Sequence, residues 1–276
     1  MTEKGPRYLY GHHESVLRSH TWRTAVNSAG YLLGYLKPDN YILDIGCGPG
    51  TITADFAALV PNGKVLGMDY VPEVLEQGRK IAVERDLKNI EFMTGDIHAL
   101  PFPDNTFDVV HTHQTLQHIH DPVKALSEMR RVTKPGGLVA ARENDISTHT
   151  FYPELKELDE FLPIYLRTAE SVGGTPKAGR HLIAWARKAG FERKDIIATT
   201  STWSFNTPQD RAWWGELWAD RIVASSFAKN AIDANIATQE DLESYAKAWR
   251  TWAADEDGWF SMIHGEIICR LYSRSQ

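Results

Sequence analysis

An acidic residue followed by three regularly spaced glycines is the part of the sequence best suited to bind a ligand. Asp44 precedes Gly46, Gly48 and Gly50 within the stretch Tyr41 to Thr51. Glycine permits a positive φ and lets bare backbone approach a ligand closely. A dinucleotide fingerprint has the spacing G-x-G-x-x-G and binds a pyrophosphate. The spacing here is G-x-G-x-G, and the acid would repel a pyrophosphate but suits a ligand that bears an ammonium or sulfonium group.

Two more acids follow apolar segments farther along the chain. Asp69 ends the segment 63–69, and Asp96 follows the segment 89–94. A carboxylate at the end of a second strand accepts hydrogen bonds from two neighbouring ribose hydroxyls, which is the expected role of Asp69. For Asp96 taken alone, an ordinary turn residue is an equally good interpretation.

Several histidines are candidates for a general base, because the imidazole pKa lies near neutral pH. His12 lies in a Tyr- and His-rich N-terminal segment, and His113 follows a predicted strand. The pairs His111-x-His113 and His118-x-His120 also suggest a metal site, but no acid or cysteine completes such a set by spacing, so we expect no metal. For His111 and His118 taken singly, a hydrogen-bonded structural role is the simpler interpretation.

Strand and helix signals alternate through the first half of the chain, and they must position these groups. Predicted strands cover 41–45, 63–69, 89–94, 109–112 and 138–142, and predicted helices cover 52–60, 72–85 and 122–132. This alternation is typical of a doubly wound α/β fold with a mostly parallel sheet, which binds ligands at the carboxyl ends of its strands. Thr51 is the expected N-cap of the first helix.

The second half of the chain departs from this alternation. A helix is predicted over 181–189, a strand over 191–199 and a final strand over 266–272, and six of the nine tryptophans lie in the helical block 204–258 when Trp259 at its flank is counted. Aromatic residues at helical spacing more often belong to a core than to a binding site. Trp213 and Trp214 are adjacent, however, and cannot both face the same way on a helix. We expect one of them to face a cleft that binds a flat, apolar or aromatic substrate.

Composition excludes several classes of protein. The 276 residues include 42% hydrophobic and 24% charged side chains, and the formal net charge is −6 with no basic run, which disfavours a nucleic-acid partner. Cys47 and Cys269 lie far apart and suggest neither a disulfide framework nor a zinc site. No stretch approaches eighteen apolar residues, so no membrane partner is expected. These features predict a soluble cytoplasmic protein, and the length suggests one large domain or two small ones.

Segments between residues 41 and 143 together resemble the class I S-adenosylmethionine (SAM) methyltransferases. Leu43 to Gly50 is similar to their motif I, L-D-x-G-x-G-x-G. Leu100 to Asp108 resembles L-P-F-x-D-x-S-F-D with threonine for serine, and Arg131 to Gly137 matches R-V-x-K-P-G-G. The resemblance is closest to the small-molecule enzymes related to those of ubiquinone and menaquinone biosynthesis, and it is thin over the N-terminal segment and the tryptophan-rich block.

This resemblance implies an architecture for the whole chain. It implies a seven-stranded, mostly parallel Rossmann-like sheet whose last strand is antiparallel. Residues 1–276 would form one domain, with N-terminal lid helices in 1–37, a SAM-binding core in 38–203, an inserted helical cap in 204–262 and the final strand in 263–276.

The resemblance also implies the cofactor and its site. SAM would be the cofactor, and the catalytic candidates are His12 and His113. The residues expected to bind the cofactor are Tyr10, Arg23, Asp44, Gly46, Cys47, Gly48, Gly50, Thr51, Asp69, Tyr70, Asp96, Ile97, His113, Gln114 and His118. The expected activity is methyl transfer to a small-molecule acceptor, apolar or aromatic. The alternative is a SAM-binding sensor or partner subunit that transfers no methyl group. The sequence determines neither the accepting atom nor the oligomeric state.

Overall fold

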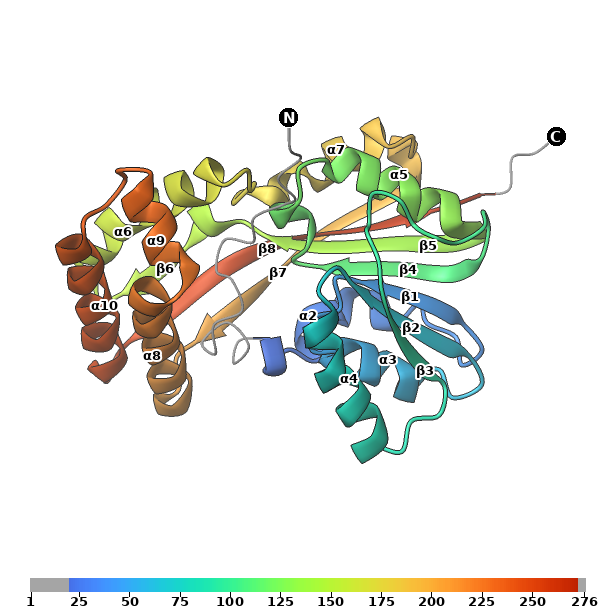
Figure 1. Cartoon of the computed structure of the whole chain (residues 1–276), viewed down its shortest axis with the longest axis horizontal. Coiled ribbons are helices and arrows are strands. Elements are labelled where there is room, and N and C mark those ends of the chain that lie inside the picture. Colours follow the sequence, from blue (N-terminus) through green and yellow to red (C-terminus); the bar gives the residue numbers. More distant parts are fainter. Residues whose placement is uncertain (1–19, 273–276) are drawn as a thin grey trace.

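Five parallel strands form the centre of the sheet in the computed structural model, which describes residues 20–272 (Figure 1). Their order is β3-β2-β1-β4-β5, with bounds β1 Tyr41–Ile45, β2 Lys64–Asp69, β3 Ile90–Thr94, β4 Phe107–His113 and β5 Thr133–Asn144. Adjacent residues of β1 face opposite layers, since Ile42 packs into one hydrophobic cluster and Leu43 into another. Burial on both faces explains why the sequence of β1 is almost entirely apolar.

Antiparallel pairing completes the sheet. β8 (Trp259–Arg270) lies between β5 and β7 (Ile196–Phe205) and is antiparallel to both. The short β6 (Thr150–Tyr152) pairs with residues 259–261 of β8. It lies on the same edge of β8 as β5, which pairs with residues 264–270. Among the described residues the sheet therefore contains eight strands but is seven strands wide. The predicted doubly wound α/β fold, with an antiparallel final strand, is confirmed.

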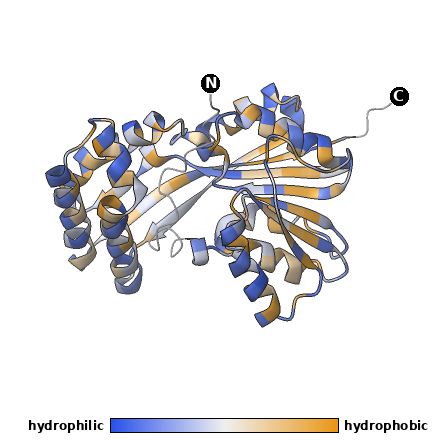
Figure 2. Ribbon diagram, viewed as in Figure 1, coloured by the Kyte–Doolittle hydropathy of each residue, from blue (hydrophilic) through white to orange (hydrophobic). Residues whose placement is uncertain are grey.

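Helices cover both faces of the sheet. Figure 1 shows α2 (Ala25–Leu33), α3 (Thr51–Leu59) and α4 (Pro72–Glu84) on one face, and α5 (Pro122–Val132) with α7 (Leu182–Lys188) on the other. Short 3₁₀ turns, η1 (Leu116–His118), η2 (Ile146–Thr148), η3 (Ala178–His181) and η4 (Arg193–Asp195), connect the larger elements. Figure 2 shows hydrophobic residues concentrated on the central strands, as the two buried faces require.

Four helices pack around the far end of β7 and β8 and form a cap. They are α6 (Lys156–Ser171), α8 (Pro208–Ala224), α9 (Ser226–Asp233) and α10 (Gln239–Ala254). Their shared core is aromatic: Trp218 stacks on Trp249 at 5.6 Å between ring centroids, and Phe161 contacts both rings. Most of the tryptophans of this block are therefore core residues, as helical spacing suggested.

Several predicted boundaries were wrong. Thr51 is the first helical residue of α3 rather than its N-cap, because Gly50 occupies the cap with a φ of 76°. Helix α6 was not predicted at all. β7 begins at Ile196 instead of residue 191, since residues 193–195 first form a 3₁₀ turn. β8 begins at Trp259 instead of residue 263 or 266, because its first residues pair with β6 and with the end of β7.

The region predicted as an N-terminal lid divides into two parts within the described residues. Helix α2 packs into the core, where Ala25, Ala29 and Leu32 are buried against α3 and the sheet. It is therefore one of the helices that cover this face of the sheet. Only residues 20–23, just before it, reach the ligand cavity described below. No helix within residues 20–272 is long and apolar enough to cross a bilayer.

Three glycines make room for one aromatic ring between α4 and the sheet. A Cβ placed on Gly50, Gly67 or Gly78 would lie 2.7–2.8 Å from a ring carbon of Phe92. These distances are shorter than any ordinary contact, so each glycine is needed where the backbone meets this ring.

We predict that Gly78→Ala destabilises the protein by roughly 1–2 kcal/mol, because the overpacking against Phe92 exceeds the gain in helix propensity. Gly30→Ala is the matched control: it is also helical, but a Cβ there meets nothing within 4 Å, so it should stabilise the protein by about 0.5–1 kcal/mol. Urea unfolding measures both changes. Equal effects of the two substitutions would contradict this account of the packing.

Candidate functional site

One large cavity opens at the carboxyl ends of the parallel strands, between the core and the cap. Its volume is about 1590 Å³, and its lining comes from the β1–α3 loop, the ends of β2, β4 and β5, and helices α8 and α9. Ligand pockets commonly measure about 300–1,000 Å³, so this space is large enough for two molecules side by side. Its position agrees with the rule that open α/β sheets bind ligands beyond the carboxyl ends of their strands.

The three loop glycines have different roles. All have positive φ, but a Cβ on Gly46 would collide with Thr115, and one on Gly50 would collide with Phe92. Gly50 does not line the cavity, and its side-chain-free Cα is required by the packing of Phe92. Gly48 alone faces open space, because the nearest atom, His20 Nδ1, lies 3.8 Å from the position that a Cβ would occupy. The backbone around Gly48 is therefore the part of the loop that a ligand can approach.

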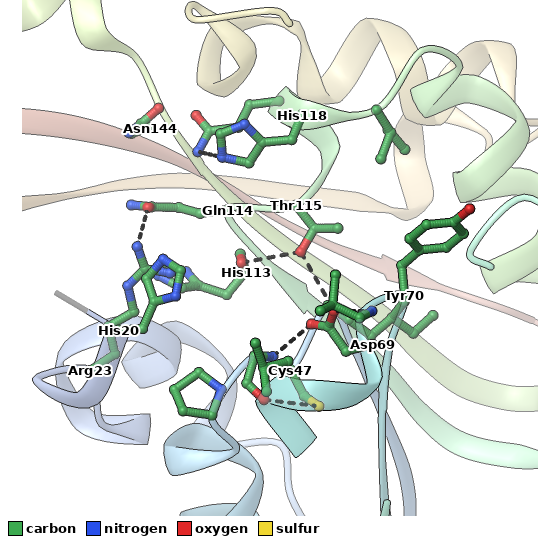
Figure 3. A pocket seen from close by; sticks show the side chains of 18 of the residues that line it. His20, Arg23, Cys47, Asp69, Tyr70, His113, Gln114, Thr115, His118 and Asn144 are labelled. Carbon is green, nitrogen blue, oxygen red and sulfur yellow. Dashed lines mark hydrogen bonds between the residues drawn. The ribbon is translucent and has the colours of Figure 1, made fainter. Parts of the chain in front are cut away.

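Asp69 fastens this loop to the end of β2 (Figure 3). Its Oδ2 accepts a hydrogen bond of 2.8 Å from the Gly48 N–H, and its Oδ1 accepts one of 3.0 Å from Val71 N–H. Carboxylate oxygens have further lone pairs, and Asp69 lines the cavity beside Tyr70, so it can still accept bonds from a ligand's hydroxyl groups.

Asp44 lies behind the loop and is almost fully buried. Its two oxygens accept hydrogen bonds from Thr53 Oγ1 at 2.6 Å and from His111 Nδ1 at 2.7 Å. The carboxylate is thus committed to β4 and α3, and its influence on a ligand in the cavity comes mainly from its negative charge. The structural role expected for His111 is the one observed here.

Asp96 and Ile97 line the cavity beyond the end of β3. The Asp96 carboxylate accepts hydrogen bonds from the backbone N–H and the Nδ1 of His98, at 2.9 and 2.8 Å. The His98 ring in turn stacks on His120, with 4.2 Å between ring centroids. These contacts hold the loop that closes the side of the cavity next to β2 and β3.

Glu143 fixes the turn after β4. It is fully buried at the end of β5, and its oxygens accept the backbone N–H groups of Thr115, Leu116 and Gln117 at 2.8–3.3 Å. Burial raises the pKa of this carboxyl to about 7, although the three N–H donors oppose the shift. Glu143 does not line the cavity, so it positions the turn instead of facing a substrate.

Gln114 joins three parts of the chain. It has a φ of 49°, its Oε1 accepts a hydrogen bond of 2.8 Å from Arg23, and its Nε2 lies 2.9 Å from His264 Nε2 on β8. The amide therefore ties the segment before α2 to the centre of the sheet (Figure 3). Arg23 and Gln114 both line the cavity.

His113 lies beside Gln114 and is 5% exposed. Neither ring nitrogen has a hydrogen-bond partner among the described residues, and the side chain lines the cavity. Burial, followed by the charges of Arg23 and Arg142, holds its pKa well below the ordinary value, so the ring is neutral at physiological pH. His118 also lines the cavity, and burial lowers its pKa to about 3.

Aromatic side chains form the wall of the cavity next to the cap. Trp203 on β7 and both Trp214 and Trp218 on α8 line it, together with Trp22 from the segment before α2. Trp213 does not line the cavity; it packs against Trp22 at 5.5 Å between ring centroids. The expected difference between the two adjacent tryptophans is therefore present, with Trp214 on the cavity side.

The structure thus gathers most of the predicted site residues around one cavity. Those that line it are Arg23, Asp44, Gly46, Cys47, Gly48, Thr51, Asp69, Tyr70, Asp96, Ile97, His113, Gln114 and His118. Tyr10 and His12 lie outside the described residues. No group of three or more His, Cys, Asp or Glu side chains in residues 20–272 is arranged to hold a metal ion.

Sequence reasoning missed several lining residues on the cap side. The spacing Trp214, Trp218, Arg221 places three side chains on one face of α8, and this stripe was readable from the sequence. Trp203, Asn144 and Met262 gave no comparable signal, because only the pairing of β7, β5 and β8 brings them to the cavity.

Residues 36–190 match the sequence model of a family described as a methyltransferase domain. The chain belongs to this family. An uncharacterized methyltransferase of Schizosaccharomyces pombe is 39% identical over 95% of both chains, and a probable methyltransferase of Aspergillus luteorubrus is 34% identical over 95% of this chain and 96% of its own. The demethylmenaquinone methyltransferase of Lactococcus lactis is 41% identical over 42% of this chain and 47% of its own length.

Solved structures share the fold of this methyltransferase. The YcgJ protein of Bacillus subtilis has a TM-score of 0.55 at 23% identity, covering 88% of this chain and 98% of its own. A phosphoethanolamine N-methyltransferase of Haemonchus contortus, solved with S-adenosylhomocysteine, has a TM-score of 0.55 at 21% identity and covers 87% of this chain and 51% of its own. The prediction of a class I SAM-dependent methyltransferase, similar to the ubiquinone and menaquinone enzymes, is confirmed.

We predict that Asp69→Ala weakens SAM binding by about 1–3 kcal/mol, because ligand hydroxyls and the Gly48 N–H both lose an acceptor. Asp69→Asn keeps one acceptor oxygen and should lose less. Glu84→Ala, an exposed acid on α4, is the control and should bind normally. Isothermal titration calorimetry with SAM and with NAD tests this. Tight binding of NAD and none of SAM would refute the assignment of the loop.

Glu143 should make the stability of the methyltransferase depend on pH. Its folded pKa of about 7 lies above the ordinary value of 4.5, so the folded state holds the proton more tightly. Stability should therefore fall as pH rises from 4.5 to 7, by roughly 3 kcal/mol. Glu143→Gln cannot titrate and should lack this decrease, whereas Glu84→Gln should retain it. Urea unfolding at pH 5 and pH 8 measures the difference, and parallel pH dependence in all three proteins would contradict it.

Proposed function

We propose that this methyltransferase transfers the methyl group of SAM to a small, flat, apolar or aromatic acceptor that binds between the end of β4 and the cap. The observation that carries the proposal is the aromatic wall of Trp22, Trp203, Trp214 and Trp218 in a cavity larger than one ligand requires. Rigid indole rings favour flat partners, which they contact over a large area with little loss of side-chain entropy.

The glycine-loop end of the cavity suits the cofactor. Gly48 leaves open space above the loop, Asp69 offers carboxylate lone pairs at the end of β2, and Tyr70 and Ile97 provide apolar surface for an adenine ring. SAM bound there would supply an electrophilic methyl group. The protein's own contribution is to orient the two molecules, and positioning of reactants can supply about 7–11 kcal/mol of a reaction barrier.

We propose that His113 contacts the accepting atom. It lies at the end of β4, between the glycine loop and the tryptophan wall, and both of its ring nitrogens are available among the described residues. Arg23, Gln114 and His118 line the same stretch of the cavity, and we propose that they contact the methionine portion of the cofactor. Tyr10 and His12 remain candidates from the sequence alone.

The rival hypothesis is a SAM-binding protein without transferase activity. The space on the cap side argues against it, because a sensor needs no second binding chamber lined by four tryptophans. Release of S-adenosylhomocysteine in the presence of flat aromatic compounds, compared with aliphatic ones of equal size, tests the proposal. Turnover of the aliphatic set alone would contradict an aromatic acceptor, and turnover of neither set would favour the rival.

We predict that Trp214→Leu raises KM for the acceptor about tenfold and changes SAM affinity less than twofold, since only acceptor contacts are lost. Trp213→Leu is the matched control, because Trp213 does not line the cavity. Steady-state kinetics, SAM titration and thermal melts of both variants test this. Equal losses of Tm with unchanged KM would show that both tryptophans serve only the core.

A further inference from the structure

Positively charged guanidinium groups lie against the tryptophans of the acceptor chamber. The Cζ atoms of Arg142 and Arg23 are 5.0 and 5.7 Å from the ring centroid of Trp203. The Cζ of Arg221 is 5.1 Å from the ring centroid of Trp218. Arg23 and Arg221 line the cavity themselves, whereas Arg142 is buried behind it.

These contacts determine which ligands the aromatic wall can attract. Aromatic rings without neighbouring cations attract ammonium groups, because the faces of the rings carry partial negative charge. Here guanidinium groups already make that interaction with Trp203 and Trp218. A second cation in the chamber would face repulsion from them, and a negatively charged group would be attracted.

The chamber also contains hydrogen-bond donors that have no partner within residues 20–272. The indole N–H groups of Trp214 and Trp218 are buried and have no acceptor among the described residues, and both rings line the cavity. Neutral His113 carries one further N–H in either tautomer. Asn144, with an unpartnered Oδ1 among the described residues, adds an amide that can present either an oxygen or an NH₂ group. Buried donors of this kind require an oxygen acceptor, which a ligand can provide.

The neighbouring acids are engaged elsewhere. Glu143 accepts three backbone N–H groups of the turn after β4. Glu266 accepts from Arg142, Ser201 and Thr199, and Asp233 on α9 pairs with Lys229 at 2.6 Å. None of these carboxylates is placed to accept the indole N–H groups of the chamber.

We propose that the acceptor is an acidic hydroxyl compound, a phenol or an enol, and that it binds in this chamber as its oxyanion. The proposal rests on the proposed function, because it names the substrate class of the same site. Arg221 would stabilise the negative charge, and the indole N–H groups with His113 would donate hydrogen bonds to the oxygen atoms.

The reaction then needs no strong base. The hydroxyl proton passes to solvent on binding, and the oxyanion's electron pair forms the new bond to the methyl carbon. The carbon–sulfur bond breaks with its electrons going to sulfur, which yields a methyl ether and S-adenosylhomocysteine. His113 acts as an N–H donor in this scheme, in agreement with the low pKa that burial and the neighbouring arginines impose on it.

The charged and titratable groups of the surrounding elements influence the pKa of the acceptor's hydroxyl group. They are Arg23 before α2, Asp69 and Asp96 at the cofactor end, His113 on β4, His118 in η1, Arg142 and Glu143 on β5, Arg221 on α8, Lys229 and Asp233 on α9, and His264 and Glu266 on β8. Burial lowers the pKa of Arg142 only to about 10, so its guanidinium stays charged near neutrality. Burial also lowers the pKa of His264 well below its ordinary value.

The test uses 4-nitrophenol as a probe, because its anion alone absorbs strongly in the visible range. We expect the complex of the full chain with S-adenosylhomocysteine to bind it as the anion and to lower its pKa by about one unit or more. 4-Nitroaniline and benzylammonium, of similar size, should bind at least about tenfold more weakly. Binding of neutral 4-nitrophenol with an unchanged pKa, no binding at millimolar concentration, or preference for the ammonium probe would each overturn the proposal.

Variants assign the effect to the chamber. Arg221→Met should reduce or abolish the pKa shift, and Arg221→Lys should partly restore it, while affinity for S-adenosylhomocysteine stays the same. Arg250→Met is the matched control, since Arg250 pairs with Glu216 on the exposed side of the cap. If Arg221→Met does not fold, the pH titration of the unaltered protein still decides the question.

The two proposals fail in different ways. Methyl transfer to an amine or thiol, without ionisation of the phenol, would overturn the oxyanion proposal and leave the aromatic acceptor in place. Ionisation of bound 4-nitrophenol, with methyl transfer to aliphatic enols alone, would support the oxyanion proposal and contradict the flat aromatic acceptor of the proposed function.

Discussion

A buried carboxylate at the end of β5 holds the centre of this protein together. Glu143 is removed from water, and it satisfies its charge with the N–H groups of Thr115, Leu116 and Gln117. A buried carboxylate needs hydrogen-bond donors, and a tight turn leaves backbone N–H groups without acceptors. The carboxylate and the turn therefore satisfy each other's hydrogen-bonding groups. The position of Gln114, and through it Arg23 and His264, follows from this arrangement.

The other acids of the site work in the same way. Asp69 holds the backbone of the glycine loop through Gly48, and Asp44 holds β4 through His111. Each carboxylate connects the end of one strand to the loop or strand beside it. The carboxyl edge of the sheet is therefore cross-linked by hydrogen bonds before a ligand binds, and such pre-organisation reduces the entropy lost on binding.

Strand β8 connects this rigid edge to the cap. Its second half pairs with β5, its first three residues pair with β6, and β7 pairs with it along nearly its whole length. Met262 and His264 lie where these two regions meet, and β7 brings Trp203 alongside. Trp22 packs edge-on against Trp203 at 5.1 Å, so the segment before α2 also forms part of the wall between core and cap. The wall of the cavity next to the cap thus combines residues that lie far apart in the chain, from Trp22 to Met262.

Local patterns in the sequence were sufficient for the cofactor half of the molecule. The strands, the loop with Gly48 and the acid Asp69 lie within short segments, where periodicity and turn chemistry act over a few residues. The sequence alone therefore determined the fold class, the family and the cofactor. Tertiary structure alone decided that Asp44 accepts hydrogen bonds from the side chains of Thr53 and His111, and that Glu143 accepts backbone N–H groups. It also decided that Gly50 packs against Phe92 and that Trp214 faces the cavity. These roles depend on which distant side chains and strands meet, and long-range contacts of this kind leave no periodic signal along the chain.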